Sequence, residues 1–436
     1  MEGKDRVSTT TIKTVTRARR LAGAVSMPGD KSISHRYAML AAIADGASHL
    51  HSFAESVDCQ STLNCLKKLG VKIERQGNEV AIQGVGLDGL CASAGPLDAG
   101  NSGSTIRMLS GILSGQPFPT VIGGDASLSR RPMKRIIEPL ARMGARIQSS
   151  EGGLPPLTIE GGNLSAIYYE LPVASAQVKT AVLFAGLYAA GTTEVVEPHL
   201  TRDHSEIALR QFGVDVGRQG STISIQGGSR LAAQDLTVPG DISSAAFFLV
   251  AGLLVPGSEL TLQNVGLNRT RTAVIDFLRL MGGDISTLNC QGHNGEPVGS
   301  VRVTAGPLRG GEIPASMIPG LIDELPVLAV LGTQAANGLI FRGAQELRLK
   351  ESDRIAAVAD NLRRMGAEVE EFPDGLKIGG RQQLKGAEIA SYGDHRIAMA
   401  FAVAGLIADG TTVIDDSACV QISFPSFFEI VESVTQ

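Results

Sequence analysis

The chain has 436 residues, a formal net charge of −5, 43% hydrophobic residues and only 4% aromatic residues. This length predicts two or more domains with large cores. The acidic balance and the scarcity of aromatic rings argue against a nucleic-acid or membrane binder, so any anion site must be a local gathering of Lys and Arg.

The N-terminal residues 1–20 are polar and rich in Thr and Arg, without the apolar stretch of a secretory signal. No run in the sequence approaches the ~20 apolar residues that a membrane span needs. The five cysteines lie far apart and form no Cys-x-x-Cys pair, which indicates reduced thiols. We therefore expect a cytoplasmic protein.

The first distinctive stretch runs from Pro28 to Arg36, where a glycine turn leads into an Ala-rich run. This pattern predicts a helix whose unpaired N–H groups attract anions. Lys31, Ser32 and Arg36 add cations and a hydroxyl at the same place, as a phosphate or carboxylate site requires. A capped helix with a solvated basic first turn explains this one segment equally well.

Two phrases recur along the whole chain. The first is the end of an amphipathic helix, a glycine and the start of a strand, with its glycines at 70, 144, 213, 282 and 366. The second is an Ala/Leu-rich helix that ends near a glycine and leads into an apolar strand, with glycines at 46, 115, 191, 257, 338 and 410. Their interleaving predicts six similar units, each with two helices and several strands.

Each unit also contains a short apolar strand-like run and two helix starts rich in Ser, Asn, Asp, Lys and Arg. The predicted strands include residues 80–82, 157–159, 223–225, 301–303 and 376–378. A symmetric arrangement of six units would aim these helix starts at a common, positively charged cleft. The repeats alone also fit a solenoid scaffold.

Two cationic loops, 129–132 and 350–354, add further anion-binding capacity. Asp323 and Glu351 are the candidate acid/base groups, because a carboxylate among cations stays ionised unless burial raises its pKa. Asp323 could instead simply begin a helix, and Glu351 could pair with Arg354 or Arg348 on one helix face.

Neither a metal site nor a nucleotide site is predicted. His35, His204 and His395 lie beside Arg or Asp, but no His-x-x-x-His spacing occurs. The loop 101–104 could cradle a phosphate, yet it is neither a Walker loop nor a dinucleotide fingerprint.

Several long motifs, in order from about Leu21 to the C-terminus, resemble the 5-enolpyruvylshikimate-3-phosphate (EPSP) synthase family. They are Pro28-Gly-Asp-Lys-Ser-Ile-Ser-His-Arg36, Gly100-Asn-Ser-Gly-Ser-Thr-Ile-Arg107, Arg131-Pro-Met, Ala174-Ser-Ala-Gln-Val-Lys179, Thr201-Arg-Asp-His204, Ile322-Asp-Glu-Leu-Pro326, Leu347-Arg-Leu-Lys-Glu-Ser-Asp-Arg354 and Asp394-His-Arg-Ile-Ala-Met399.

The resemblance implies an α/β (α+β) fold of two domains, each of three βαβαββ repeats around a pseudo-threefold axis, as in an inside-out barrel. The active site would lie in the interdomain cleft. On this basis we expect one domain over residues 23–238 and a second over residues 1–22 and 239–436, with hinges near 22 and 239.

The resemblance also implies transfer of the enolpyruvyl group of phosphoenolpyruvate to the 5-hydroxyl of shikimate 3-phosphate. Phosphate would leave by C–O cleavage after a tetrahedral intermediate, with no metal or organic cofactor. The catalytic residues would be Asp323, which accepts the hydroxyl proton, and Glu351 with Lys31, which manage the protons of the methylene carbon.

The family motifs further imply two sets of binding residues. Shikimate 3-phosphate would meet Lys31, Ser32, Arg36, Ser175, Ala176, Gln177, Arg202, Asp323 and Lys350. Phosphoenolpyruvate would meet Lys31, Asn101, Gly103, Arg131, Gln177, Arg354 and Arg396.

Two positions depart from the family pattern. Gln421 and Ile422 precede Ser423-Phe424-Pro425 where many relatives carry a Lys, so no binding residue is expected there. Ser104-Thr105 stand where Thr and a small residue are common. Gly103 is retained, and because relatives with Ala there tolerate glyphosate, our hypothesis is that glyphosate inhibits this protein.

Two alternatives remain open on the sequence. The sister transferase that acts on UDP-N-acetylglucosamine has the same fold and usually carries a loop cysteine. Its N-terminal signature has Lys-Asn, whereas here Ser32 follows Lys31. A non-catalytic phosphosugar-binding protein would not need both Asp323 and Glu351. We expect a monomer without nucleic-acid or membrane partners.

Overall fold

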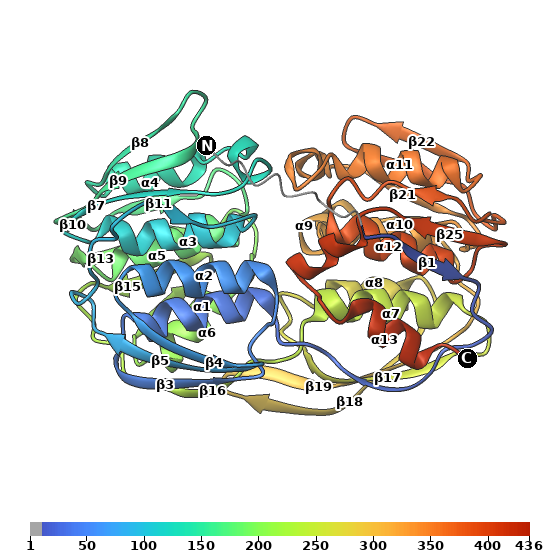
Figure 1. Ribbon diagram of the computed structural model, residues 1–436, viewed down its shortest axis with the longest axis horizontal. Coiled ribbons are helices and arrows are strands. Elements are labelled where there is room, and N and C mark those ends of the chain that lie inside the picture. The colour runs from blue at the N-terminus through green and yellow to red at the C-terminus, as the bar shows by residue number, and fades with distance from the viewer. Residues whose placement is uncertain (1–10) are drawn as a thin grey trace, which may run out of the picture.

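The computed structural model describes residues 11–436, which form two lobes joined at one edge (Figure 1). The buried apolar side chains of the described residues gather into two separate clusters. One draws on residues 33–238, and the other on residues 15–27 and 242–434. The two-domain fold is confirmed, while the expected hinge positions stay predictions. The N-terminal segment 1–10, part of the predicted polar segment and of the predicted second domain, lies outside the described residues.

The first domain contains six α-helices and one short 3-10 helix among the described residues. These are α1 (Lys31–Ala42), α2 (Val57–Lys68), α3 (Gly103–Ser114), η1 (Leu128–Arg130), α4 (Lys134–Arg142), α5 (Ala176–Gly186) and α6 (His204–Gln211). Its strands are β3 (Asp45–His51), β4 (Lys72–Gln76), β5 (Glu79–Val85), β6 (Leu97–Asp98), β7 (Pro119–Gly123), β8 (Arg146–Ser150), β9 (Leu154–Glu160), β10 (Leu164–Ser165), β11 (Tyr168–Glu170), β12 (Ala189–Ala190), β13 (Thr192–Val196), β14 (Val216–Gln219), β15 (Thr222–Gln226) and β16 (Asp235–Thr237).

The second domain combines an N-terminal segment with the C-terminal half of the chain. Its helices are α7 (Ile242–Leu254), α8 (Ala273–Leu280), η2 (Ala315–Met317), α9 (Ile318–Leu321), α10 (Leu325–Gly332), η3 (Gln345–Leu349), α11 (Arg354–Arg364), α12 (His395–Gly405), η4 (Ser417–Ile422) and α13 (Phe427–Val434). Its strands are β1 (Lys13–Thr16), β2 (Ala22–Ser26), β17 (Glu259–Gly266), β18 (Asp284–His293), β19 (Glu296–Thr304), β20 (Gly311–Glu312), β21 (Leu339–Phe341), β22 (Val369–Phe372), β23 (Gly375–Ile378), β24 (Glu388–Ile389) and β25 (Thr411–Ile414).

Six small sheets repeat one pattern, in which a parallel pair is extended by antiparallel strands. Their orders are β16-β3-β5-β4, β6-β7-β9-β8, β11-β13-β15-β14, β2-β17-β19-β18, β20-β21-β23-β22 and β24-β25-β1. Each predicted strand lies in one of these sheets. The pattern matches the expected βαβαββ unit, with three units in each domain.

The two domains exchange strands. Strand β2 leads into α1 of the first domain but pairs with β17 of the second, whereas β16 leads into α7 but pairs with β3. The two connecting segments therefore run side by side, and the Asp30 and Asp241 amides donate to the carbonyls of Pro239 and Pro28 at 2.7 and 2.8 Å. Strand β1 pairs with β25, so the N-terminal segment fills a strand position in the sixth unit that the C-terminal sequence lacks.

The first helix of each unit is central. In the second domain α7, α10 and α12 pack on one another, while the sheets lie outside them (Figure 1). Residues 242–253 of α7 are all buried. A helix that is apolar all round must be enclosed on every side, which places these helices inside and turns their polar first residues toward the gap between the domains.

Glycines set both the helix ends and the closest helix contacts. The five glycines predicted to end amphipathic helices all have positive φ values between 81° and 113°. Gly111 has a different task, because a Cβ there would lie 2.2 Å from the Ala181 carbonyl oxygen. Because glycine has no Cβ atom, α3 can approach α5 closely. Both helices carry predicted site residues.

We expect Gly111→Ala to lower the free energy of unfolding by about 1–3 kcal/mol, because α3 and α5 must separate. Gly292→Ala is the control, since a Cβ there meets no atom within 4 Å. Urea unfolding of both variants measures the difference. A Gly111→Ala variant as stable as the wild type would contradict the close-approach account.

Candidate active site

Side-chain caps begin the helices that point into the interdomain region. Asp30, Ser102, Ser175, Asp353 and Asp394 each accept a hydrogen bond from a backbone N–H in the first turn of α1, α3, α5, α11 or α12. These caps fix the orientation of each first turn. The side chains that follow them along the sequence are the ones brought together between the domains.

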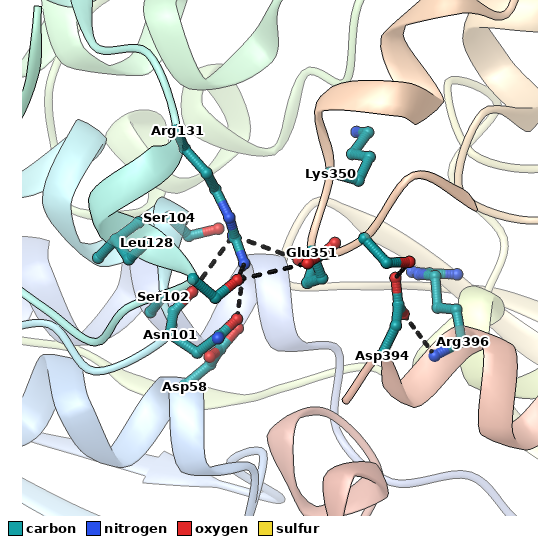
Figure 2. A network of polar contacts seen from close by, with 12 residues as sticks. Asp58, Asn101, Ser102, Ser104, Leu128, Arg131, Lys350, Glu351, Asp394 and Arg396 are labelled. Carbon is teal, nitrogen blue, oxygen red and sulfur yellow. Dashed lines mark hydrogen bonds and ion pairs between the residues drawn. The ribbon is translucent and has the colours of Figure 1, made fainter. Parts of the chain in front are cut away.

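Arg131 joins the two domains directly. Its Nη1 lies 3.4 Å from Glu351 Oε1, and its Nη2 donates to Asn101 Oδ1 at 2.7 Å (Figure 2). Ser127 also donates, at 3.4 Å, to the Glu351 carbonyl oxygen. Glu351 lies between η3 and α11, so this contact bridges the second unit of one domain and the fifth unit of the other.

Glu351 and Arg354 form the centre of the second-domain side. Arg354 is fully buried, and its Nη2 donates to Glu351 at 2.5 Å while its Nε donates to Asp394 at 2.8 Å. Burial alone would raise the pKa of Glu351, but the charges of Arg354 and Arg131 outweigh it and hold the pKa well below its ordinary value. This carboxylate is therefore ionised at neutral pH.

Asp323 contacts cationic side chains from both domains. Arg202 of the first domain contacts its Oδ2 at 2.6 Å, and Lys350 contacts its Oδ1 at 3.4 Å. Arg396 donates to its carbonyl oxygen at 2.6 Å. Burial opposes ionisation, but Lys350, Arg396 and Arg202 together hold the pKa of Asp323 well below 3.8.

Lys31 and Arg36 lie on successive turns at the start of α1. Lys31 donates to Asp58 Oδ2 at 2.9 Å, and although burial favours its neutral form, Asp58 raises the pKa of Lys31 above its ordinary value. Arg36 donates to the hydroxyls of Ser205 and Thr180 at 2.8 and 3.0 Å. Burial, followed by repulsion from other cations, lowers the pKa of Arg36 to about 10.

Helix α3, which begins at Gly103, contributes a further cation. Arg107 Nη1 donates to Gln177 Oε1 at 2.8 Å, and Gln177 Nε2 donates to Ser104 Oγ at 3.0 Å. A Cβ on Gly103 would lie 2.8 Å from Arg107 Nη1 and 3.4 Å from Arg131 Nη1, so a glycine is needed for both guanidinium groups to come this close.

We call the charged residues gathered here the interdomain charge cluster. Its members are Lys31, Arg36, Asp58, Arg107, Arg131, Arg202, Asp323, Glu324, Lys350, Glu351, Arg354, Asp394 and Arg396. The named members are eight cations and five carboxylates, so together they carry a net positive charge although the chain is acidic. The buried carboxylates Asp30 and Glu206 also act on Arg36 from nearby. Among the described residues, no carboxylate lies within ion-pair distance of Arg36 or Arg107, which leaves both suited to bind anions.

The structure brings most of the predicted site residues into this cluster or against it. Ser175 and Ala176 begin α5 beside Gln177, and Ser32 contacts Arg36 only through its carbonyl oxygen. Gln421 is exposed on η4.

Asp58, Arg107, Glu324 and Asp394 were not among the predicted site residues. Arg107, Glu324 and Asp394 lie inside the family motifs, so a signal existed for these three. His395 was noted only for its neighbours. It is buried without a hydrogen-bond partner among the described residues, and burial lowers its pKa to about 3, so its ring is neutral.

Across residues 11–436, no helix is long and apolar enough to cross a membrane, and no three His, Cys, Asp or Glu side chains gather as a metal site. His35 instead contacts the Thr62 hydroxyl at 2.7 Å, and His204 contacts Glu296 at 2.6 Å.

Comparison with solved structures first identifies the fold as that of an enolpyruvyl transferase. The enolpyruvyl transferase NikO from Streptomyces tendae superposes with a TM-score of 0.78 at 18% identity, covering 98% of this chain and 97% of that one. EPSP synthase from Acinetobacter baumannii superposes with a TM-score of 0.87 at 44% identity, covering 98% of each chain.

Sequence comparison identifies the family. The model of EPSP synthase (3-phosphoshikimate 1-carboxyvinyltransferase) matches residues 15–431. A 3-phosphoshikimate 1-carboxyvinyltransferase from Solibacter usitatus is 54% identical over 97% of this chain and all of that protein. One from Koribacter versatilis is 52% identical over 96% of this chain and 98% of its own length. The chain belongs to the EPSP synthase family.

We expect Asp323→Asn to lower the free energy of unfolding at pH 7 by roughly 1–3 kcal/mol, because four neighbouring cations lose their shared carboxylate. The folded-state pKa of Asp323 is depressed, so its contribution is complete above the unfolded value near 3.8 and is lost as the pH falls through the folded value. The difference between wild type and variant should therefore shrink below about pH 4.

Urea unfolding at pH 7 and at about pH 3.5 measures this difference. Glu312→Gln is the control, because Glu312 is exposed and takes part in no ion pair among the described residues. A wild-type-minus-variant difference that stays constant across this range would contradict the assigned pKa direction.

Proposed function

We propose that this protein transfers the enolpyruvyl group of phosphoenolpyruvate to the 5-hydroxyl of shikimate 3-phosphate, as a 3-phosphoshikimate 1-carboxyvinyltransferase of the shikimate pathway. Family membership supports this reaction. The observation that carries the proposal at the level of residues is the interdomain charge cluster. It holds excess cations for two phosphorylated carboxylates, and within it Asp323 and Glu351 remain ionised as potential bases.

Shikimate 3-phosphate is assigned to the side formed by α1, α5 and the loop before α6. Arg36 and Arg202 supply charge for its phosphate and carboxylate, while Ser32, Ser175 and Gln177 supply polar contacts. Ala176, Lys31, Lys350 and Asp323 complete the proposed set. Arg36 supports this assignment because it is a buried cation already held in place by two hydroxyls.

Phosphoenolpyruvate is assigned to the side formed by the glycine loop and the second domain. Arg131 and Arg354 converge on Glu351 from opposite domains, and Arg396 approaches Asp323 nearby. Asn101 orients Arg131, and Gly103 leaves room for the guanidinium groups. Lys31 and Gln177 border both substrates.

The proposed chemistry has two stages. Asp323 accepts the proton of the 5-hydroxyl as its oxygen attacks C2 of phosphoenolpyruvate, while C3 gains a proton to give a tetrahedral intermediate. C3 then loses a proton as the bond between C2 and the phosphate oxygen breaks, which releases phosphate and restores the vinyl group. Glu351, with Lys31 beside it, manages the protons at C3, and the fixed cations stabilise the charge that develops.

Substrate binding would also change the two carboxylates. In the free protein the cations of the cluster depress the pKa values of Asp323 and Glu351, which makes both groups weak bases. Phosphate and carboxylate groups of the substrates would pair with Arg131 and Lys350 in place of the two carboxylates. The pKa values of Asp323 and Glu351 would then rise toward the range useful for proton transfer. The bases become effective when both substrates are present.

Further properties follow as part of the proposal. The protein acts as a cytoplasmic monomer on two small molecules, without metal, organic cofactor, nucleic acid or membrane. Enolpyruvyl transfer to UDP-N-acetylglucosamine is the second candidate, and no residue of the cluster favours it.

The test is phosphate release from phosphoenolpyruvate. We expect the wild type to release phosphate when shikimate 3-phosphate is present and not when UDP-N-acetylglucosamine replaces it. Glu351→Gln should reduce kcat by about 10²–10⁴-fold, because it removes a proton-transfer group. Glu346→Gln is the control, since Glu346 lies on the neighbouring η3, is half exposed and pairs with Arg135 of α4 at the surface.

Release that requires UDP-N-acetylglucosamine would move the chain to the sister activity. Substrate binding without turnover would reduce it to a binding protein. Equal activities of Glu351→Gln and Glu346→Gln would remove Glu351 from the mechanism.

We also expect glyphosate to inhibit the wild type in competition with phosphoenolpyruvate, and Gly103→Ala to raise the inhibition constant by about 10-fold or more. The added methyl group would displace Arg107 and Arg131. The KM for shikimate 3-phosphate should change less than the inhibition constant, because only Gln177 among its assigned residues contacts Arg107. A wild-type inhibition curve that stays flat far above the KM for phosphoenolpyruvate would contradict the expectation.

A further inference from the structure

Behind the shikimate 3-phosphate side lies an ion cluster that the proposed chemistry does not use. Lys179 of α5 is fully buried, and its Nζ contacts Glu197, which follows β13, and Glu206 of α6. The distance to Glu206 Oε1 is 2.7 Å, and both carboxylates are at most 2% exposed. We call Lys179, Glu197 and Glu206 the Lys179 cluster.

Stability alone does not explain the Lys179 cluster. Removing three ions from water costs several kcal/mol per ion, and well-packed apolar side chains often do as well or better. Arg218, which lies 3.6 Å from Glu206, adds a fourth charge from β14. Such an arrangement fixes geometry, because each charge accepts only a narrow range of partner positions.

One end of the cluster holds the loop that carries Arg202. Glu197 Oε2 accepts a hydrogen bond from the Thr201 amide at 2.9 Å, and its Oε1 accepts one from the Thr201 hydroxyl at 3.2 Å. Arg202 is the next residue and reaches across the domains to Asp323 at 2.6 Å. The buried carboxylate of Glu197 therefore fixes the backbone from which the Arg202 side chain extends.

The other end sets the position of Arg36. Thr180 follows Lys179 on α5, and Ser205 precedes Glu206 on α6. The two hydroxyls lie 2.5 Å apart and both accept from Arg36. The Lys179–Glu206 pair therefore fixes the helix spacing at which these hydroxyls hold Arg36. The same helix α5 begins with Ser175 and carries Gln177.

We propose that Lys179, Glu197 and Glu206 are positioning residues for the shikimate 3-phosphate side of the site. They tie α5, α6 and the Arg202 loop into one unit. Helix α5 and the loop carry residues assigned to that substrate, and Ser205 of α6 holds Arg36. Of the residues assigned to phosphoenolpyruvate only Gln177 lies on this unit, whereas Arg131, Arg354 and Arg396 lie on other elements. The proposal rests on the proposed function, and it predicts a much larger effect on shikimate 3-phosphate than on phosphoenolpyruvate.

The test is Glu197→Gln, which keeps the size of the side chain and removes its charge. We expect the KM for shikimate 3-phosphate to rise about 10-fold or more, because a small misplacement of a binding group is costly. The KM for phosphoenolpyruvate should change much less, by about twofold, since only Gln177 among the residues assigned to it lies on α5, α6 or the Arg202 loop. Calorimetric titration with shikimate 3-phosphate alone should show the same loss of affinity.

Val195→Ala is the matched control. Val195 is fully buried on β13 two residues before Glu197, so its truncation loosens the same unit without touching the Lys179 cluster. We expect it to lower stability and leave both KM values within about twofold of the wild type. Equal changes in both KM values for Glu197→Gln, or the same selective change for Val195→Ala, would overturn the positioning role.

Thr201→Val decides the question if Glu197→Gln does not fold. It removes only the hydroxyl hydrogen bond to Glu197, and we expect a selective rise of about 3-fold in the KM for shikimate 3-phosphate. No change would overturn the proposal. A wild type that turns over both substrates while these variants show no selectivity would refute the positioning role alone. A wild type without turnover would refute the proposed function.

Discussion

A charge removed from water needs a partner, and this constraint organises the region between the two domains. Arg131 and Arg202 of the first domain form ion pairs with Glu351 and Asp323 of the second. In the proposed function the anionic groups of the substrates would replace these carboxylates as partners of Arg131 and Arg202. Such an exchange of partners would couple substrate binding to the contacts between the domains.

The repeated unit explains how so many polar side chains reach one place. In each unit a polar first turn is followed by an apolar helix, and burial of that helix leaves its start at the interdomain face. Because the units share one geometry, the fold places every helix start in an equivalent position. The side chains of the first turns differ between units, so each start contributes different polar groups. The exchange of β2 and β16 between domains keeps the two sets of starts facing each other.

Much of the fold could be predicted from local signals. The glycines that end amphipathic helices, the alternating strands and the capping residues act within a few positions of the chain, so their patterns are visible in the sequence. Pairing over long distances is not visible in this way. Nothing in residues 13–16 marks them as the partner of β25, and nothing near Lys179 marks Glu197 and Glu206 as its buried neighbours. The contact of Asp58 with Lys31 likewise depends on how α1 and α2 pack.

In the proposed reaction the C–O bond of phosphoenolpyruvate breaks at the interdomain charge cluster and the phosphorus atom is left untouched. Phosphoenolpyruvate labelled with ¹⁸O at the oxygen between C2 and phosphorus, turned over with shikimate 3-phosphate, tests this directly. We expect ³¹P NMR to find the label retained in the released phosphate, because the vinyl carbon is the site of attack. Phosphate without the label would show that the P–O bond had broken and would contradict this mechanism.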